Sequence, residues 1–288
     1  MMNRDILTLI QENMHTFSKG QKRIANFILE SYDKAAFMTA SRLGKRVNVS
    51  ESTVVRFAAE LGFDGYPDMQ RSLQKMIRNR LTSVQRIEVT NDRIGDQDLL
   101  SSVLQSDMEK IRQTLEEMDR DTFEYAVDAI VNAHRIYIIG VRSSAAIATF
   151  LHFYFNLIFD NVVMVSAHTS SEMFESMLRV GDKDVVIGVS FPRYSSRTVQ
   201  AMNFASDRGA TTISITDSDA SPLANTSKYT LKARSDMASF VDSLVAPLSL
   251  VNALLVAVSR KKNDDLAHTF QSLEQIWEEY GVYEKVQE

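Results

Sequence analysis

The chain has 288 residues, 44% of them apolar and 24% charged, a composition typical of globular proteins and a length sufficient for two domains. It has no cysteine, which excludes disulfides, thiolate metal sites and a cysteine nucleophile. The net charge of −5 is uneven: residues 1–80 carry 13 Lys and Arg against 8 Asp and Glu, and the remainder carries 19 against 29. A basic lobe on an acidic body indicates that only the first lobe meets a polyanion, although scattered surface charge fits the same counts.

Residues 1–80 predict consecutive short helices without a strand pattern. A helix begins near Thr39 and ends before a turn at Asn48. Ser50 then caps the next helix, which ends at Gly62. Two short helices joined by a tight turn are typical of a helix-turn-helix.

The helix after Ser50 has two distinct faces. A projection at 100° per residue groups an apolar stripe of Val54, Phe57, Ala58 and Leu61. Ser52, Arg56 and Ala59 face directly away from this stripe. A recognition helix needs a short hydroxyl, a small residue and an arginine on its outer face to read the major groove of double-stranded DNA. A three-helix core whose polar face only meets water would give the same pattern.

Basic residues surround this helix in the sequence. They are Lys19, Lys22, Arg23, Arg42, Lys45 and Arg46. The motif and the basic lobe together favour an operator-binding domain over a simple helical core. We take Arg42, Lys45 and Arg46 as candidate DNA contacts.

Three stretches in this lobe, Ala40–Gly44, Val49–Phe57 and Leu61–Tyr66, resemble the N-terminal domain of MurR/RpiR-type regulators. The resemblance covers about the first quarter of the chain. It implies that Ser52, Thr53 and Arg56 contact DNA. The helical projection selects Ser52 and Arg56 independently.

Residues 81–97 are polar and weakly patterned, and we expect them to link the domain at 1–80 to a second domain at 98–288. The second domain begins with a long amphipathic helix. Short β-branched runs then follow at 135–139, 162–165, 185–189, 211–215 and 229–231. Helical stretches separate the first four runs, which predicts an α/β fold with a doubly wound parallel sheet of flavodoxin-like strand order.

The chain ends in two predicted helices, at 239–260 and 264–280. Pro247 kinks the first of them or marks its start. The strongest apolar run, at 244–258, is too short and too interrupted to span a bilayer, and the first 14 residues lack a secretory signal pattern. We therefore expect a cytoplasmic protein with no membrane partner, and we predict no cofactor and no metal site.

Two loops rich in hydroxyl groups follow the first and third predicted strands. Their candidate ligand-binding residues are Arg142, Ser143 and Ser144 in the first loop and Ser190, Arg193 and Ser195 in the second. Ligands of doubly wound sheets collect at the carboxyl ends of such strands, and an anionic sugar requires hydroxyl, amide and guanidinium donors. A serine at a helix start is also an ordinary cap, so each serine alone is weak evidence.

The region from about Asp119 to Arg260 resembles the sugar isomerase (SIS) domain. The resemblance rests on Gly140–Ser144, on the loop at Ser190 and on the helix end at 208–210. It implies that Ser144, Ser190 and Ser195 help to bind a phosphosugar, with Ser195 in place of the usual threonine.

Two departures from the SIS pattern alter the usual phosphate cradle. Arg142 stands where a second glycine is usual, and Pro192-Arg193 replace a Ser-Gly pair. Three interpretations remain open. The arginines supply charge that backbone amides supply elsewhere, or the ligand is not an ordinary sugar phosphate, or the arginines point away from a degenerate pocket.

Isomerisation of a sugar phosphate needs a base, and His168 and Glu172 are the nearest candidates. A lone loop histidine is more often an ordinary polar residue, and the helix dipole explains a glutamate at a helix start. We therefore predict no catalytic residue. The leading hypothesis is a regulator whose DNA binding responds to a phosphorylated or acidic sugar. The alternatives are a sugar-phosphate isomerase with a vestigial helical domain and a DNA-binding protein whose α/β domain only oligomerises.

A homodimer or larger homo-oligomer is expected, because one helix-turn-helix reads too few base pairs and paired half-sites require two-fold symmetry. The predicted C-terminal helices carry apolar side chains that suit such an interface. These are Leu244, Leu248, Val251, Leu255 and Val258.

Overall fold

The computed structural model describes residues 6–77, 82–94, 98–167, 169–236, 239 and 241–283. The chain divides into two compact units. The first consists of residues 1–103 together with 237–242, and the second consists of residues 104–236 together with 243–288. Within the described residues, no helix has both the length and the apolar character needed to cross a membrane.

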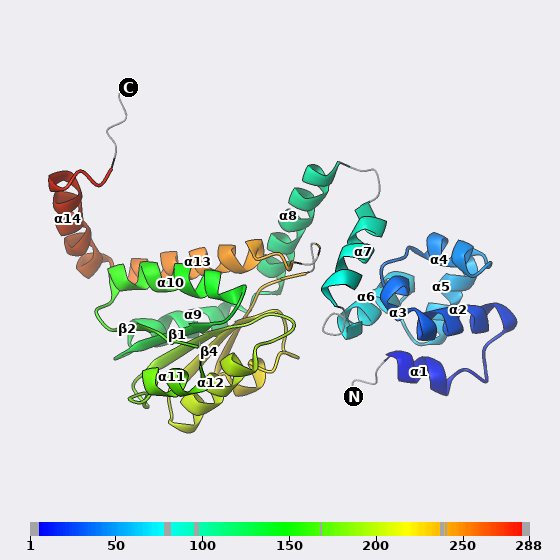
Figure 1. The fold of residues 1–288 in the computed structure, drawn as a ribbon, viewed down its shortest axis with the longest axis horizontal. Helices are drawn as coiled ribbons and strands as arrows, with labels where there is room; N and C mark the ends of the chain where they lie inside the picture. The colour runs from blue at the N-terminus through cyan, green and yellow to red at the C-terminus, as the bar shows by residue number, and fades with distance from the viewer. Residues whose placement is uncertain are drawn as a thin grey trace. The chain divides into compact units, whose positions relative to one another are not determined.

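The first unit is built from helices in its described part (Figure 1). They are α1 (Ile6–Glu12), α2 (Lys19–Glu30), α3 (Tyr32–Ala35), α4 (Ala40–Arg46), α5 (Glu51–Glu60), α6 (Tyr66–Ile77) and α7 (Ser83–Ile94). A capping box opens α2, where Ser18 Oγ accepts from Gln21 N–H and Gln21 Oε1 accepts from Ser18 N–H at 2.9 Å. Residues from α1, α2, α4, α5 and α6 share one apolar core.

Helix α7 occupies most of the segment expected to be a linker, and it is fixed to other parts of the first unit. Gln85 Nε2 donates to Asp33 Oδ2 at 3.2 Å. The side chain of Arg86 is only 2% exposed and pairs with Asp242 at 2.9 Å. Because Asp242 lies 156 residues further along the chain, local periodicity could not reveal this contact. The polar composition of this segment therefore gave no sign of helix α7, which side-chain hydrogen bonds hold in place.

Helix α8 (Leu99–Glu117) leads into the second unit, whose sheet has the order β2-β1-β3-β4-β5 with all pairs parallel. The strands are β1 (Ile136–Gly140), β2 (Val162–Met164), β3 (Val185–Val189), β4 (Thr211–Thr216) and β5 (Tyr229–Lys232). This order is flavodoxin-like, so the predicted α/β fold and its helical N-terminal partner are confirmed.

Helices cover both faces of the sheet (Figure 1). Residues of α9 (Arg120–Val131), α10 (Ser144–Ile158) and α13 (Val245–Lys261) form one apolar cluster with the strands. Residues of α11 (Ser170–Ser176) and α12 (Ser196–Asp207) form a second cluster on the opposite face. The connection before β5 contains only the short 3-10 helix η1 (Ala224–Thr226).

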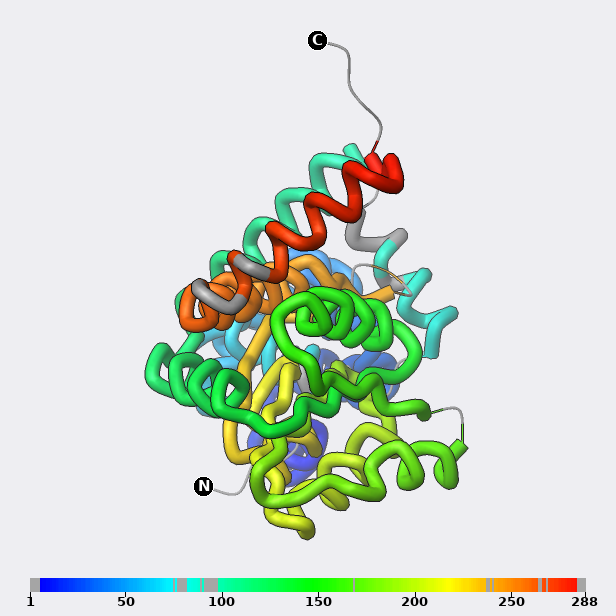
Figure 2. The backbone as a smooth tube through the Cα atoms, turned by 90° about the vertical axis from the view of Figure 1, so that its left-hand side faces the viewer, coloured from blue at the N-terminus to red at the C-terminus, as the bar shows by residue number. Residues whose placement is uncertain are grey.

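The first C-terminal helix starts later than predicted, at Val245 instead of residue 239. The residues before Val245 form a loop that two hydrogen bonds of Ser243 hold in place. Ser243 N–H donates to Asp236 O at 3.1 Å, and Ser243 Oγ donates to Asp107 Oδ1 at 2.6 Å. Pro247 lies in the first turn, where its missing N–H removes no helical hydrogen bond, and therefore marks the start instead of a kink. The last helix, α14 (Asn263–Glu279), leads away from the sheet (Figures 1 and 2).

Candidate functional site

The turn between α4 and α5 requires a glycine. A Cβ atom on Gly44 would lie 2.8 Å from the carbonyl oxygen of Val49, closer than side-chain carbons approach backbone oxygens. Val49 N–H donates to Gly44 O at 2.8 Å and closes the turn. Asn48 has a φ of 55°, in the left-handed region that asparagine tolerates better than most residues. The turn therefore sets α5 against α4 as in a helix-turn-helix.

Hydroxyl groups organise the start of α5. Ser50 Oγ accepts from Thr53 N–H at 3.3 Å and lies 2.9 Å from Ser52 Oγ and 2.8 Å from Thr53 Oγ1. Thr53 is half-buried, and its methyl group lies 3.5 Å from the position that a Cβ on Gly20 would take. Of the two predicted hydroxyl contacts, Ser52 is therefore the more accessible.

The two faces of α5 are those expected from the helical projection. Val54, Phe57 and Ala58 are fully buried. Ser52, Arg56 and Ala59 are exposed. The predicted basic residues Arg42, Lys45 and Arg46 are exposed as well. The described lobe thus has an accessible arginine-bearing helix face together with several accessible cations.

The two candidate ligand loops leave the sheet side by side. β1 pairs with β3, and Gly140 is the direct partner of Val189. The loops that follow these residues therefore start at the same level of the same sheet edge. The placement expected from a flavodoxin-like strand order is confirmed for the strands that carry both loops.

Arg142 and Arg193 both adopt left-handed backbone conformations, with φ values of 58° and 65°. Both side chains are exposed. A non-glycine residue pays roughly 1–2 kcal/mol for this conformation, which glycine adopts without strain. These are positions where the SIS pattern has glycine. The loops keep the backbone conformation of a glycine while carrying a guanidinium group instead.

The predicted serines have different surroundings. Ser144 and Ser190 are buried, whereas Ser143 is exposed and Ser195 is half-buried. Ser190 Oγ accepts from Ser195 N–H at 3.1 Å and so fixes the entry into α12. Ser143 and Ser195 are the N-cap residues of α10 and α12, yet neither side chain makes a capping hydrogen bond. Capping therefore does not explain these two hydroxyls.

A polar cluster between β3 and β4 was not predicted. Tyr194 Oη donates to Asp217 Oδ1 at 2.7 Å, and Asp217 is buried directly after β4. Thr216 Oγ1 lies 2.8 Å from Ser190 O and 2.8 Å from Ser221 Oγ. The sequence signal that could have revealed this cluster is Asp217, a polar residue directly after a buried strand. The cluster attaches the loop that carries Arg193 to the neighbouring strand.

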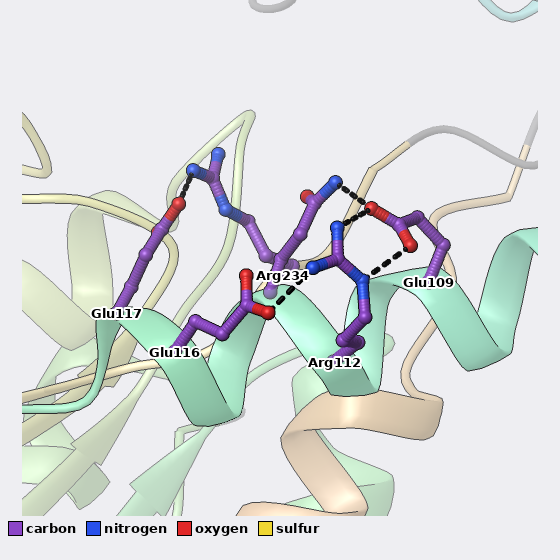
Figure 3. A network of polar contacts seen from close by, with 6 residues as sticks. Glu109, Arg112, Glu116, Glu117 and Arg234 are labelled. Atoms are coloured by element: carbon purple, nitrogen blue, oxygen red, sulfur yellow. Dashed lines mark hydrogen bonds and ion pairs between the residues drawn. The ribbon is translucent and has the colours of Figure 1, made fainter.

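The chain after β5 is attached to α8 (Figure 3). Arg234 donates from its backbone N–H to Thr114 Oγ1 at 2.9 Å and from its guanidinium to Glu117. Burial lowers the pKa of Arg234, but the bond to Glu117 and the charges of Asp236 and Asp217 together raise the pKa above its ordinary value. This arginine is therefore a permanent cation in a mostly acidic environment.

Before Glu117 on α8, a surface network links Arg112 to Glu109 and Glu116 (Figure 3). The hydrogen bonds from Arg112 and Gln113 lower the pKa of Glu109 to about 2. All three charged side chains are solvent-exposed, so water screens their attraction and the network adds little to stability.

Of the two candidate bases, the structure describes Glu172. Glu172 follows the edge strand β2 and is exposed, and its carboxylate accepts from Ser166 Oγ at 3.0 Å. His168 lies outside the described residues. In the described part of the chain, no three His, Asp or Glu side chains gather in a way that could hold a metal ion.

Comparisons with known proteins match both halves of the chain. Residues 4–80 match the helix-turn-helix domain of the rpiR family, and residues 129–257 match the SIS domain. The transcriptional regulator HexR of Escherichia coli is 27% identical over 263 residues, which cover 90% of this chain and 89% of HexR. An HTH-type regulator of Caldanaerobacter subterraneus is 24% identical over 280 residues, covering 94% of this chain and 96% of its own length.

Solved structures agree with these matches. The sugar isomerase domain of an RpiR transcription factor from Sphaerobacter thermophilus is 28% identical with a TM-score of 0.59, covering 62% of this chain and 99% of that domain. NanR of Vibrio vulnificus, solved in complex with ManNAc-6P, shares the fold with a TM-score of 0.58 and 23% identity, covering 94% of this chain and 97% of its own. An rpiR-type helix-turn-helix followed by an SIS domain makes this chain a member of the RpiR family of transcriptional regulators.

Proposed function

We propose that this regulator binds double-stranded operator DNA through α5 and that a phosphorylated or acidic sugar bound in its SIS domain modulates that binding. The outer face of α5 carries the DNA-binding proposal, because Ser52 and Arg56 are exposed opposite a fully buried stripe. Thr53, Arg42, Lys45 and Arg46 complete the proposed contact set. We keep residues 1–80 as the proposed DNA-binding domain, 81–97 as its connection and 98–288 as the sensing domain.

Replacing Arg56 with alanine tests the DNA interface. The variant should lose about 1–3 kcal/mol of specific operator affinity if Arg56 reads a base, or show a flatter salt dependence if it contacts a phosphate. Fluorescence anisotropy with an operator selected from random duplexes measures both quantities. Arg208→Ala is the matched control, because Arg208 ends α12 in the SIS domain. Unchanged affinity and salt slope in folded Arg56→Ala would contradict the proposal.

The two left-handed arginines carry the ligand proposal. A strained backbone persists where the surrounding structure and a function retain it, and both strained arginines follow paired strands at the carboxyl edge of the sheet. Guanidinium groups form strong charge-assisted hydrogen bonds with phosphates and carboxylates. Ser143, Ser144, Ser190 and Ser195 would add hydroxyl groups around such an anion. NanR, which shares this fold, binds ManNAc-6P, so amino-sugar phosphates belong in the first ligand screen.

A direct comparison of Arg193→Ala with Ser190→Ala tests this site. The guanidinium of Arg193 adds attraction between opposite charges to its hydrogen bonds with the anion, whereas the hydroxyl of Ser190 carries no charge, so Arg193→Ala should lose more affinity. The probes are ManNAc-6P, glucose 6-phosphate and 6-phosphogluconate, ranked first by thermal shift and then measured by calorimetry. Arg208→Ala should bind as the unchanged protein does. Full retention of binding by Arg193→Ala would place the pocket elsewhere.

The same probes test regulation. A ligand shifts the DNA-binding equilibrium only if it prefers one conformation of the protein, because equal affinity for both shifts nothing. We therefore expect a bound sugar to change operator affinity, and we expect this change to be lost in Arg193→Ala.

The SIS domain is proposed to bind its ligand without converting it. Glu172 is exposed after the edge strand β2, whereas the paired loops follow β1 and β3. A regulator that consumed its effector would also erase its own signal. Turnover of hexose or pentose phosphates by the purified protein would contradict this proposal and favour an isomerase.

A dimer or larger oligomer remains part of the proposed function. Val251 and Val258 cannot serve as interface residues, because both are buried in the core of the SIS unit. Leu248 is exposed on α13, and so is Val256, which the sequence reasoning did not select. Light scattering should give at least twice the monomer mass of 32.6 kDa at micromolar concentration. A monomer both with and without DNA would contradict the expectation.

A further inference from the structure

Val55 is an exposed apolar residue on the helix that is proposed to read DNA. Its side chain is 42% exposed. Among the side chains described in residues 6–77, it is the only large apolar one that is exposed. Its neighbour Val54 is fully buried in the core of the unit. Val55 is not among the residues of that core, so its exposed apolar surface is available for contact with another molecule.

The position of Val55 on α5 matches that of a base-reading residue. It is the fifth residue of the helix, within the first two turns, the part of a recognition helix that contacts base edges. On the outward face, Val55 and Arg56 flank Ser52 and Ala59. Ala59 lies one turn later, and its small side chain lets this face approach a groove closely.

The chemistry of valine limits what it can recognise in DNA. It neither donates nor accepts hydrogen bonds, and its β-branched side chain is held mostly in one rotamer in a helix, so its methyl groups have a fixed place. The major groove presents one apolar group among its base edges, the C5 methyl group of thymine. Contact between the two removes apolar surface of both from water.

We propose that Val55 determines sequence specificity by packing against the C5 methyl group of a thymine in each operator half-site. This inference rests on the proposed binding of DNA by α5. It adds to that proposal a residue which recognises a base by apolar contact, beside the polar contacts of Ser52 and Arg56.

The experiment compares thymine with deoxyuridine, which differs only by the missing methyl group. An operator is selected from random duplexes with the unchanged full-length protein, and each thymine is then replaced singly by deoxyuridine. A single replacement at the contacted thymine should weaken binding by about threefold to fivefold, the loss expected for one methyl-sized apolar contact. Val55→Ala should bind the two duplexes equally well at that position while remaining sensitive to changes elsewhere in the operator.

Two further variants make the comparison specific. Val84→Ala removes a 65% exposed valine on α7, outside the helix-turn-helix, and should keep the full deoxyuridine effect. Val55→Thr keeps the shape of the side chain and replaces one methyl with a hydroxyl, so it should retain part of the effect. Because Val55 is outside the core, both of its variants should unfold at the temperature of the unchanged protein.

Two results would overturn the inference while leaving DNA binding intact. One is an operator whose affinity no deoxyuridine replacement changes, and the other is a Val55→Ala variant with the full deoxyuridine effect. Selection of no sequence above background would instead contradict DNA reading by α5, and the inference with it.

Discussion

Asp242→Ala should lower the free energy of unfolding of the first unit by about 3–5 kcal/mol, the cost of removing one partner from a buried ion pair. The guanidinium of Arg86 lies 2.9 Å from Asp242, and the two side chains are only 2% and 16% exposed. Without the carboxylate, the buried guanidinium loses this ion pair in a medium that stabilises charge less than water does. Urea denaturation measures the loss, and hydrogen exchange of α7 peptides locates it.

Asp219→Ala is the matched control for this prediction. Asp219 pairs with Lys232 at 2.9 Å but is 77% exposed, so its removal should change stability by less than about 1 kcal/mol. The double variant Arg86→Met with Asp242→Leu should recover most of the lost stability, because an apolar pair leaves no buried charge. A free energy of unfolding of Asp242→Ala that differs from that of the unchanged protein by less than about 1 kcal/mol, the contribution of a typical neutral hydrogen bond, would contradict this prediction.

Gly140→Ala should destabilise the SIS unit by about 1–3 kcal/mol and weaken ligand binding. A Cβ atom on Gly140 would lie 2.6 Å from Ser144 O and 2.8 Å from Ala148 Cβ, so the first turn of α10 has to move away from β1. That turn carries Ser143 and Ser144 of the proposed ligand site. Thermal unfolding measures the stability, and calorimetry with the best sugar-phosphate probe measures the binding.

Gly181→Ala controls for the general effect of replacing a glycine in this unit. No atom lies within 4 Å of the Cβ that Gly181 would gain, so this substitution should leave both the melting temperature and the ligand affinity nearly unchanged. Equal melting temperatures for Gly140→Ala and Gly181→Ala would mean that α10 adjusts without strain at the strand end.

The sequence by itself determined the elements whose signals are local. The cap at Ser50 and the buried stripe of α5 follow from residues within two helical turns of each other, and all five strands were recognised from short β-branched runs. The flavodoxin-like strand order expected of a doubly wound sheet agrees with the observed order, so the sheet edge at which the loop with Ser190 and Arg193 begins was also predictable.

Only the tertiary structure decided the features that depend on partners distant in sequence. The pairing of Arg86 with Asp242 holds helix α7 within the segment expected to connect the two domains, and contacts of Ser243 delayed the start of α13. The bond from Tyr194 to Asp217 likewise joins two strand ends. A hydrogen bond of this kind leaves no periodic trace in either segment, whereas burial of a helix or strand face does. For that reason the sequence predicted the strands, the recognition helix and the sheet edge that carries the proposed site, and the structure alone showed helix α7 and the polar residues that hold these elements in place.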